Sequence, residues 1–315
     1  MRIAFFTESQ FLGKIPREHK NRRTEVAWQI ALDAFHIPLG FQRLNEISGS
    51  FDLGIIIVPK NIRDHVIYEN FMRTIRSICK KVAIMQEGPN WYFQDYSIIQ
   101  QIWYYNSLVE ADFLLCHNES DIPYYEGLTG KRVYNMPSLM TVDNLKKSDK
   151  KYQQAIIGGN FVSWYGGFDS YIVAQEFNVP VYAPHMGRMP TEEINFEDLK
   201  HLPYLDWTDW ITALSEFRYG VHLMRIQAAG TFALNCAYLG IPNIGYKGLD
   251  TQEILHPKTT VAIGDLKSAK ELARKLRDDE TFYHQCSSAA EILWLSKYSE
   301  DKFKEKMNKI FEKEL

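Results

Sequence analysis

The chain has 315 residues, of which 45% are hydrophobic and 24% are charged. This balance is ordinary for a folded globular protein and excludes long disordered or collagen-like stretches. The formal net charge of −3 gives no overall attraction to nucleic acid or to an anionic membrane, so any such partner would need a local basic patch.

The length suits two domains of roughly 150 residues each. No apolar run approaches the ~20 residues that cross a bilayer, and the chain opens directly on a strand pattern, so we expect a cytoplasmic protein without a signal peptide. Oligomeric state is left open. The cysteines stand far apart, without the close pairs of zinc or redox sites, and are expected to be reduced core thiols. They are Cys79, Cys116, Cys236 and Cys286.

The first half of the chain alternates strand and helix patterns, which predicts a doubly wound parallel sheet. Its apolar runs are continuous, as expected for strands that are covered on both faces. The predicted elements are strand 2–8, helix 24–35 with Thr24 as N-cap, strand 52–59, helix 64–79, strand 81–89, helix 98–109 and strand 112–117. We assign residues 1–145 to an N-terminal, acceptor-side Rossmann-like domain, which passes into a polar linker at 141–151.

A second alternation follows the linker, and residues 154–290 are assigned to a C-terminal Rossmann-like domain. Its predicted elements are strand 154–157, helix 169–177, strand 179–183, a helix from Thr208 or Asp209 to Phe217, strand 219–224, a helix opened by Gly230 and Thr231, and a strand from Ile244. A long charged helix at 291–315 is expected to pack back across both domains. The predicted class is therefore α/β, with two Rossmann-like domains facing a central cleft.

Polar residues end three of the first-domain strands. Ligands of doubly wound sheets bind at the carboxyl ends of strands, so Glu8, Glu87 and His117 are candidates by position. Of the three we favour Glu87, because Gly88-Pro89 ends its strand sharply and holds the carboxylate at the edge of the sheet. For Glu8 and His117 the alternative is an ordinary capping or solvent-facing group.

The segment from Ala228 to Tyr246 has the pattern of a helix followed by a strand. Gly230 and Thr231 open the helix, and their amides would face an anion at the positive end of the helix dipole. Asn235 lies one turn further on and shares a face with Thr231, which places it near a sugar hydroxyl. The alternative is a packed helix with glycine in a tight turn.

A second glycine turn, Gly158-Gly159-Asn160, follows the strand at 154–157. Without side chains, these glycines let the backbone approach a diphosphate. Arg225, just after the strand at 219–224, is expected to bring a positive charge to the same place. The alternative for Arg225 is a purely structural role.

Five Lys and Arg residues crowd the loop between residues 14 and 23, which joins the first strand to the first helix. Such runs are often solvated surface. The alternative is contact with an anionic donor or acceptor, for which we select Arg22 as an acceptor-side residue. A DNA acceptor would need this loop.

Several chemistries lose support because their motifs are absent from the sequence. There is no Asp-x-Asp pair, no His-Glu-x-x-His and no nucleophile elbow. We therefore expect no metal site and no cofactor. What remains is a reaction in which a diphosphate leaves and one carboxylate activates an incoming hydroxyl.

The layout and two segments, 154–161 and 225–246, resemble GT-B nucleotide-sugar glycosyltransferases. Segment 154–161 and the carboxylate at the end of a first-domain strand are also similar to the phage β-glucosyltransferases that modify hydroxymethylated DNA. The resemblance implies a UDP-sugar as co-substrate, Glu87 as base, inversion at the anomeric carbon, and a glycan, a small molecule or a hydroxylated DNA base as acceptor.

The resemblance also implies roles for further residues of the second domain. The family usually has Glu where Asn235 stands, so contact with the ribose is weakened or nucleotide preference differs. The loops at 182–185 and 203–207 should touch the nucleobase, with His185 as a donor contact or an ordinary surface residue, and Gln252 should contact the donor. The alternatives are a nucleotide-sugar epimerase, a retaining transferase, and a non-catalytic nucleotide- or glycan-binding protein.

Overall fold

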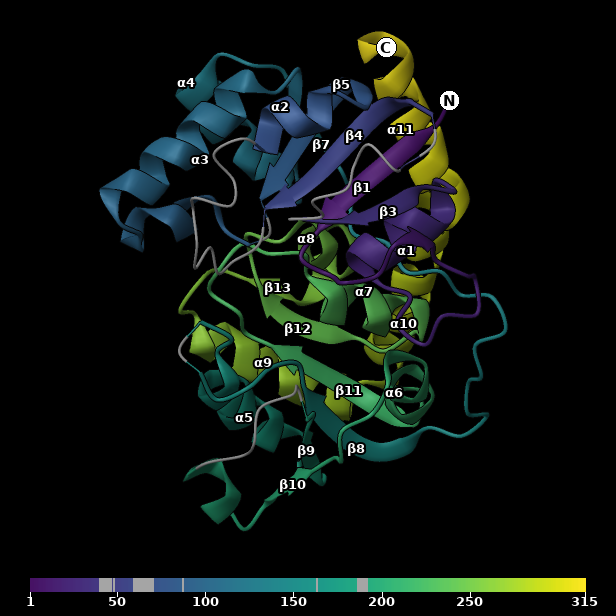
Figure 1. Ribbon diagram of the computed structural model, residues 1–315. Coiled ribbons are helices and arrows are strands. Elements are labelled where there is room, and N and C mark those ends of the chain that lie inside the picture. The colour runs from purple at the N-terminus through teal and green to yellow at the C-terminus, as the bar shows by residue number, and fades with distance from the viewer. Residues whose placement is uncertain (40–46, 48, 59–70, 87, 163, 186–191) are drawn as a thin grey trace.

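The computed structural model describes residues 1–39, 47, 49–58, 71–86, 88–162, 164–185 and 192–315. Two sheets, each covered by helices on both faces, form the two halves of the molecule (Figure 1). This arrangement confirms the predicted fold class.

Within the described residues, the first sheet has seven strands in the order β2-β3-β1-β4-β5-β6-β7. All neighbouring pairs are parallel except β2 with β3. The strands are β1 Ile3–Thr7, β2 Gly13–Lys14, β3 Phe35–Pro38, β4 Phe51–Val58, β5 Cys79–Gln86, β6 Phe113–Cys116 and β7 Val133–Asn135. The helices are α1 Thr24–Ala31, α2 Phe71–Arg76, α3 Ile98–Glu110 and α4 Ile122–Thr129.

The second sheet, counted over the same described part, has six parallel strands in the order β10-β9-β8-β11-β12-β13. They are β8 Tyr152–Ile157, β9 Val181–Ala183, β10 Leu199–His201, β11 Phe217–His222, β12 Asn243–Tyr246 and β13 Thr260–Val261. The helices are α5 Gly167–Ala174, α6 Trp207–Leu214, α7 Thr231–Tyr238, α8 Asp250–Leu255, α9 Leu266–Asp278, α10 Glu280–Leu293 and α11 Glu300–Glu314.

The C-terminal segment differs from the single helix predicted from 291 to 314. Helix α10 continues into a π-helical turn, Trp294–Tyr298, and the extended backbone of Ser299 then starts α11. Helix α10 packs against α7 of the second domain. The apolar face of α11 enters the core beneath the first sheet, so the C-terminal helices contact both halves as expected. That face consists of Phe303, Met307, Ile310 and Phe311.

Three other local predictions are corrected. Helix α1 ends at Ala31 rather than Phe35, because Phe35 already begins strand β3. Thr24 is not the N-cap: Arg23 takes that extended position, and Thr24 has a φ of 47°. The N-cap of α6 is Asp206 rather than Thr208 or Asp209.

Candidate functional site

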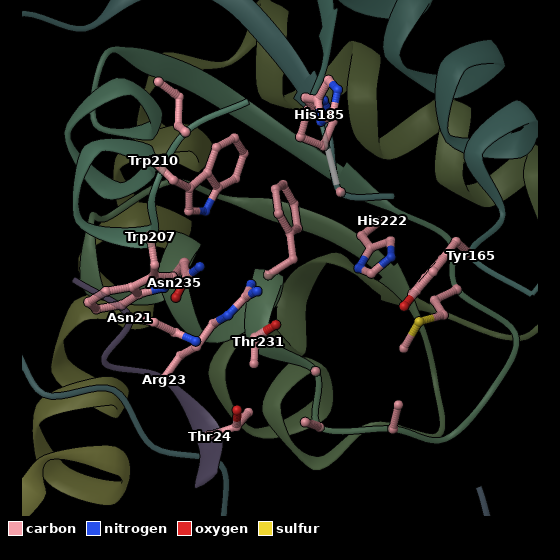
Figure 2. A pocket seen from close by; sticks show the side chains of 18 of the residues that line it. Asn21, Arg23, Thr24, Tyr165, His185, Trp207, Trp210, His222, Thr231 and Asn235 are labelled. Carbon is pink, nitrogen blue, oxygen red and sulfur yellow. The ribbon is translucent and has the colours of Figure 1, made fainter. Parts of the chain in front are cut away.

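A pocket of about 450 Å³ lies between the facing ends of the two sheets (Figure 2). Both domains contribute to it. From the first domain come Asn21, Arg23, Thr24, Gly88 and His117. From the second come Gly158, Tyr165, Pro184, His185, Pro203, Tyr204, Leu205, Asp206, Trp207, Trp210, His222, Met224, Ala228, Ala229, Gly230, Thr231, Phe232 and Asn235.

Helix α7 begins in the wall of this pocket. Gly230 has a φ of 64°, a left-handed conformation that glycine adopts without strain. A Cβ at Gly230 would stand 2.0 Å from Oγ1 of Thr251, which donates to the Gly230 carbonyl at 3.0 Å. The sharp entry leaves the first amides of α7 without helical partners at the positive end of the helix dipole, as the sequence predicted for Gly230 and Thr231.

The Gly158-Gly159 turn has a different surrounding from the one expected. A Cβ at Gly158 would stand 2.5 Å from Cγ of His222 and 2.6 Å from a ring carbon of Phe232. A Cβ at Gly159 would stand 2.8 Å from Cβ of Tyr165. The missing side chains therefore make room for the His222 and Tyr165 side chains. Gly158 still lines the pocket.

His222 ends strand β11 and is the main site residue that the sequence analysis missed. Its ring lies 5.4 Å from that of Phe232, edge to face, and stacks at 6.4 Å on Tyr165. Burial lowers the pKa of His222 to about 4, so the ring is neutral near pH 7. Among the described residues, its buried Nε2 has no hydrogen-bond partner. The available signal was its place in the last half of the strand predicted at 219–224, close to the carboxyl end where ligands bind.

The opposite end of the pocket is aromatic. Asn235 is buried and, with its amide oriented to satisfy both atoms, donates to the Thr231 carbonyl and accepts from Nε1 of Trp210, each at 3.2 Å. Nε1 of Trp207 is buried and finds no acceptor within the described part of the chain. His185 also lines the pocket, with its ring edge to face on Tyr204 at 5.6 Å.

The first-domain wall holds a buried histidine. His117 follows strand β6 and packs its ring 5.4 Å from that of Trp28 on α1. Gly88 also lines this wall and has a φ of 101°. Glu87, the predicted base, lies outside the described residues.

Six described residues chosen from the sequence do not line the pocket, and Gly159 of the turn described above is one of them. The Gln252 side chain is buried within the second domain, where it bonds Asn243 and Thr260, so the expected donor contact is not supported. Arg225 is half exposed and pairs with Asp169 at 2.7 Å rather than joining the two glycine turns. The others are Glu8, Arg22 and Asn160.

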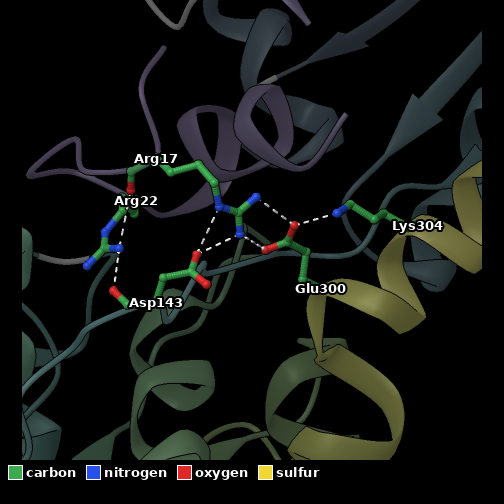
Figure 3. Close-up of polar contacts among 5 residues, drawn as sticks. All are labelled: Arg17, Arg22, Asp143, Glu300 and Lys304. Atoms are coloured by element: carbon green, nitrogen blue, oxygen red, sulfur yellow. Dashed lines mark hydrogen bonds and ion pairs between the residues drawn. The ribbon is translucent and has the colours of Figure 1, made fainter. Parts of the chain in front are cut away.

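Most of the charged side chains in the basic loop between residues 14 and 23 form ion pairs or hydrogen bonds within the molecule (Figure 3). Arg17 pairs with Asp143 of the linker at 2.6 Å and with Glu300 of α11 at 2.8 Å. Arg22 donates to the backbone carbonyls of Arg17 and Asp143. The outer pairs are Lys14 with Asp33 and Lys20 with Asp206. These pairs oppose the interpretation of the loop as a free anion-binding surface.

A partly buried set of hydrogen bonds joins the two domains beside the pocket. Nδ2 of Asn118 donates to the Ala228 carbonyl at 3.2 Å, and the Ser138 hydroxyl donates to the Ala229 carbonyl. Asp250 accepts from the Glu119 amide at 2.8 Å, while its own amide donates to Oδ1 of Asn118. Desolvation raises the pKa of Asp250 to about 6. The segment that leads into α7 is thus held by the first domain.

The described residues contain no group of three or more His, Cys, Asp or Glu placed to hold a metal ion. Nor, over the same residues, is any helix long and apolar enough to span a bilayer. All four cysteines are buried as free thiols.

Neither a protein-family model nor a curated protein sequence matches the chain. Its fold, however, is that of GT-B glycosyltransferases. Sucrose-phosphate synthase from Thermosynechococcus elongatus superposes with a TM-score of 0.67 at 11% identity, over 98% of this chain and 88% of that one.

Two further solved structures extend this likeness. An alpha-glucosyltransferase in complex with UDP and a 13-mer DNA containing an HMU base gives a TM-score of 0.66 at 13% identity, over 99% of both chains. TarM from S. aureus gives 0.63 at 11% identity, over 82% of this chain and 55% of that one. The chain thus spans about half the length of TarM. At the level of fold, these matches confirm the resemblance that the sequence predicted.

Proposed function

We propose that this protein is a glycosyltransferase that moves a sugar from a UDP-sugar to an acceptor hydroxyl. The observation that carries the proposal is the pocket between the domains, which combines the start of α7 with buried polar atoms that lack partners in the described chain, His222 Nε2 and Trp207 Nε1. Such atoms are costly to bury unless a ligand bonds them. Solved neighbours of this fold hold UDP.

The two ends of the pocket fit the two ends of a sugar nucleotide. The start of α7 at Gly230 and Thr231 offers backbone amides to the diphosphate. The aromatic end, with Trp207 and Trp210, offers flat apolar surfaces and an indole N–H to the nucleobase. Asn235 lies between these ends, one turn along α7, where a ribose would follow the diphosphate.

The chemistry we propose is direct displacement at the anomeric carbon. The acceptor oxygen bonds to C1 as the bond from C1 to the diphosphate oxygen breaks, and the electron pair leaves on UDP. The acceptor proton passes to a general base, for which Glu87 remains the choice from the sequence. The start of α7 stabilises the charge that develops on the leaving diphosphate, so the reaction needs no metal ion or cofactor.

We place the acceptor against the first-domain wall, beside His117 and Gly88. The acceptor class that we favour is a glycan rather than a hydroxylated DNA base. The paired charges of Arg17, Lys14 and Lys20 support this choice, because a duplex is held largely by unpaired cations along its phosphates.

The experiment is incubation with UDP- and GDP-sugars, glycan acceptors and hydroxymethylated DNA, with and without EDTA. We expect transfer from a UDP-sugar to a glycan, undiminished by EDTA, with an inverted anomeric centre in the product by NMR. The Glu87→Gln variant should lose transfer but keep UDP binding. Tight binding with neither transfer nor hydrolysis would instead identify a nucleotide-binding protein.

A retaining reaction is the second candidate. It is favoured by the likeness to a structure named alpha-glucosyltransferase. The same NMR measurement separates the two, because a retained anomeric centre together with undiminished turnover of Glu87→Gln would remove the base from the mechanism. A nucleotide-sugar epimerase would change the donor without using any acceptor.

A further inference from the structure

A positively charged side chain would stabilise a bound diphosphate. In this pocket that side chain comes from the first domain, and not from the second domain as the sequence analysis expected. Among the described lining residues, Arg23 and Asp206 are the two with permanently charged side chains at neutral pH. Asp206 is negative and pairs with Lys20 at 2.7 Å, so Arg23 is the permanent positive charge among these described lining residues. Arg225, the arginine expected from the sequence, lies outside the pocket beside Asp169.

The backbone around Arg23 fixes the direction of its side chain. Arg23 forms an antiparallel bridge with Met140, and on either side the Thr24 amide donates to the Leu139 carbonyl while the Thr141 amide donates to the Arg22 carbonyl. Successive residues of extended chain point to opposite sides. Arg22 accordingly turns toward the linker, where it bonds carbonyls, and Arg23 turns into the pocket.

The wall that faces Arg23 is suited to an anion. It contains Gly230 and Thr231 at the start of α7 and the His222 ring (Figure 2). His222 is only 7% exposed, and its Nε2 has no partner among the described residues, so the structure leaves one buried polar atom for a ligand here. A guanidinium forms paired hydrogen bonds with phosphate oxygens, whereas helix amides contribute only partial charges.

We propose that Arg23 of the first domain binds the diphosphate of the donor, opposite the start of α7 in the second domain. This inference rests on the proposed function and adds a residue to it. It makes the donor site a shared site: the second domain alone would hold a nucleoside, while a nucleoside diphosphate requires both domains. Arg23 then also neutralises the charge left on UDP after transfer.

The test compares UDP with uridine by isothermal titration on the full chain. In Arg23→Ala we expect affinity for UDP to fall by about tenfold to a hundredfold, the range of one charge-assisted contact, while affinity for uridine changes less than about twofold. Arg23→Lys should keep part of the UDP affinity. Arg225→Ala is the matched control and should bind both ligands like the wild-type protein.

The possible outcomes distinguish a failure of the role of Arg23 from a failure of the proposed transferase function. UDP affinity unchanged in Arg23→Ala, with a normal wild-type affinity, would overturn the role of Arg23 and leave the transferase intact. A wild-type protein that binds no nucleoside diphosphate would overturn the proposed function itself. If Arg23→Ala folds poorly, Arg23→Gln serves in its place, with the salt dependence of UDP affinity as a second readout: the slope should flatten if Arg23 contacts the phosphates.

Discussion

The two glycine turns of the second domain both lie between a strand and a helix, but glycine has a different role in each. Gly230 supplies a left-handed residue that opens α7 into the pocket. Gly158 and Gly159 instead supply space, which the side chains of His222 and Tyr165 occupy. Glycine in a turn between a strand and a helix is therefore consistent with two purposes: it can leave the backbone open to a ligand, or it can leave space for a neighbouring side chain.

The difference shows which property of glycine each turn requires. At the Gly230 turn, backbone conformation matters, and the ligand would meet amides. At the Gly158 turn, packing matters, and the ligand would meet the neutral His222 ring that the glycines admit. Variants that restore a side chain at each position should fail for different reasons.

The largest effect is expected for Gly158→Ala. The new Cβ would stand about 2.5 Å from the rings of His222 and Phe232, and such overpacking should cost about 3 kcal/mol of unfolding free energy. Chemical denaturation measures this loss, and adding His222→Ala should recover part of it as a coupling of ~1 kcal/mol. Gly127→Ala in α4 is the control and should cause no loss of stability, since no atom within 4 Å would meet its Cβ and alanine is favoured over glycine inside a helix; an equal absence of loss in Gly158→Ala would refute the packing role.

The pH dependence of stability sharpens the role of His222. Its folded pKa of about 4 lies below an unfolded value near 6.5, so between these values the unfolded state binds more protons. The contribution of His222 to stability should be complete above pH 6.5 and fall by about 3 kcal/mol as the pH drops to 4. His222→Phe should flatten this fall, measured as urea midpoints against pH. His256, which has a similar pKa, keeps its own share, so an identical curve in the variant would contradict the assignment.

Gly230→Ala should cost about 2 kcal/mol, because a left-handed alanine is strained and its Cβ meets Thr251. Gly130→Ala provides a matched control, with a φ of 67° and open space around the Cβ, and isolates the backbone strain of roughly 1 kcal/mol. Thermal or urea unfolding measures both variants. UDP affinity should fall only in Gly230→Ala, and equal losses of stability in the two variants would remove the contribution of Thr251.

The smallest effect is expected at the loop that faces both turns. Lys20→Ala removes an ion pair whose lysine side chain is 75% exposed, and exposed pairs contribute roughly 0.5 kcal/mol or less. Urea unfolding should show this small loss at low salt and none at high salt. A loss comparable to that of Gly230→Ala would mean that the loop, rather than the turns, limits the stability of the pocket.

Much of the fold could be predicted because the strands are continuous apolar runs. Strands such as β4 and β5 are buried on both faces, and their composition shows it. Short elements were missed because they have no continuous apolar run that sets them apart from their neighbours. Strand β3 follows α1 after three residues, so its pattern merges with that of the helix. The break at Ser299 has no glycine or proline to announce it.

The candidate site was predicted where position along the chain decides it. Gly230, Thr231, Asn235 and His117 are brought to one pocket because strand ends and helix starts meet at sheet edges. Arg225 and Gln252 were misplaced because the direction of a side chain depends on partners that lie on other elements, here Asp169 of α5 for the arginine and Thr260 of β13 for the glutamine.

The return of α11 to the first domain has a consequence for how the chain is made. The face of the first sheet that carries Phe5, together with Trp28 of α1, is covered by Phe303 and Phe311 of α11, which are synthesised after all strands of the second sheet. During synthesis this part of the core is covered by α1 but lacks α11 while the strands of the second sheet emerge. The core of the first domain is therefore completed only after the second sheet has been synthesised. A chain that stopped before Phe303 would expose part of this apolar core to solvent and would tend to aggregate.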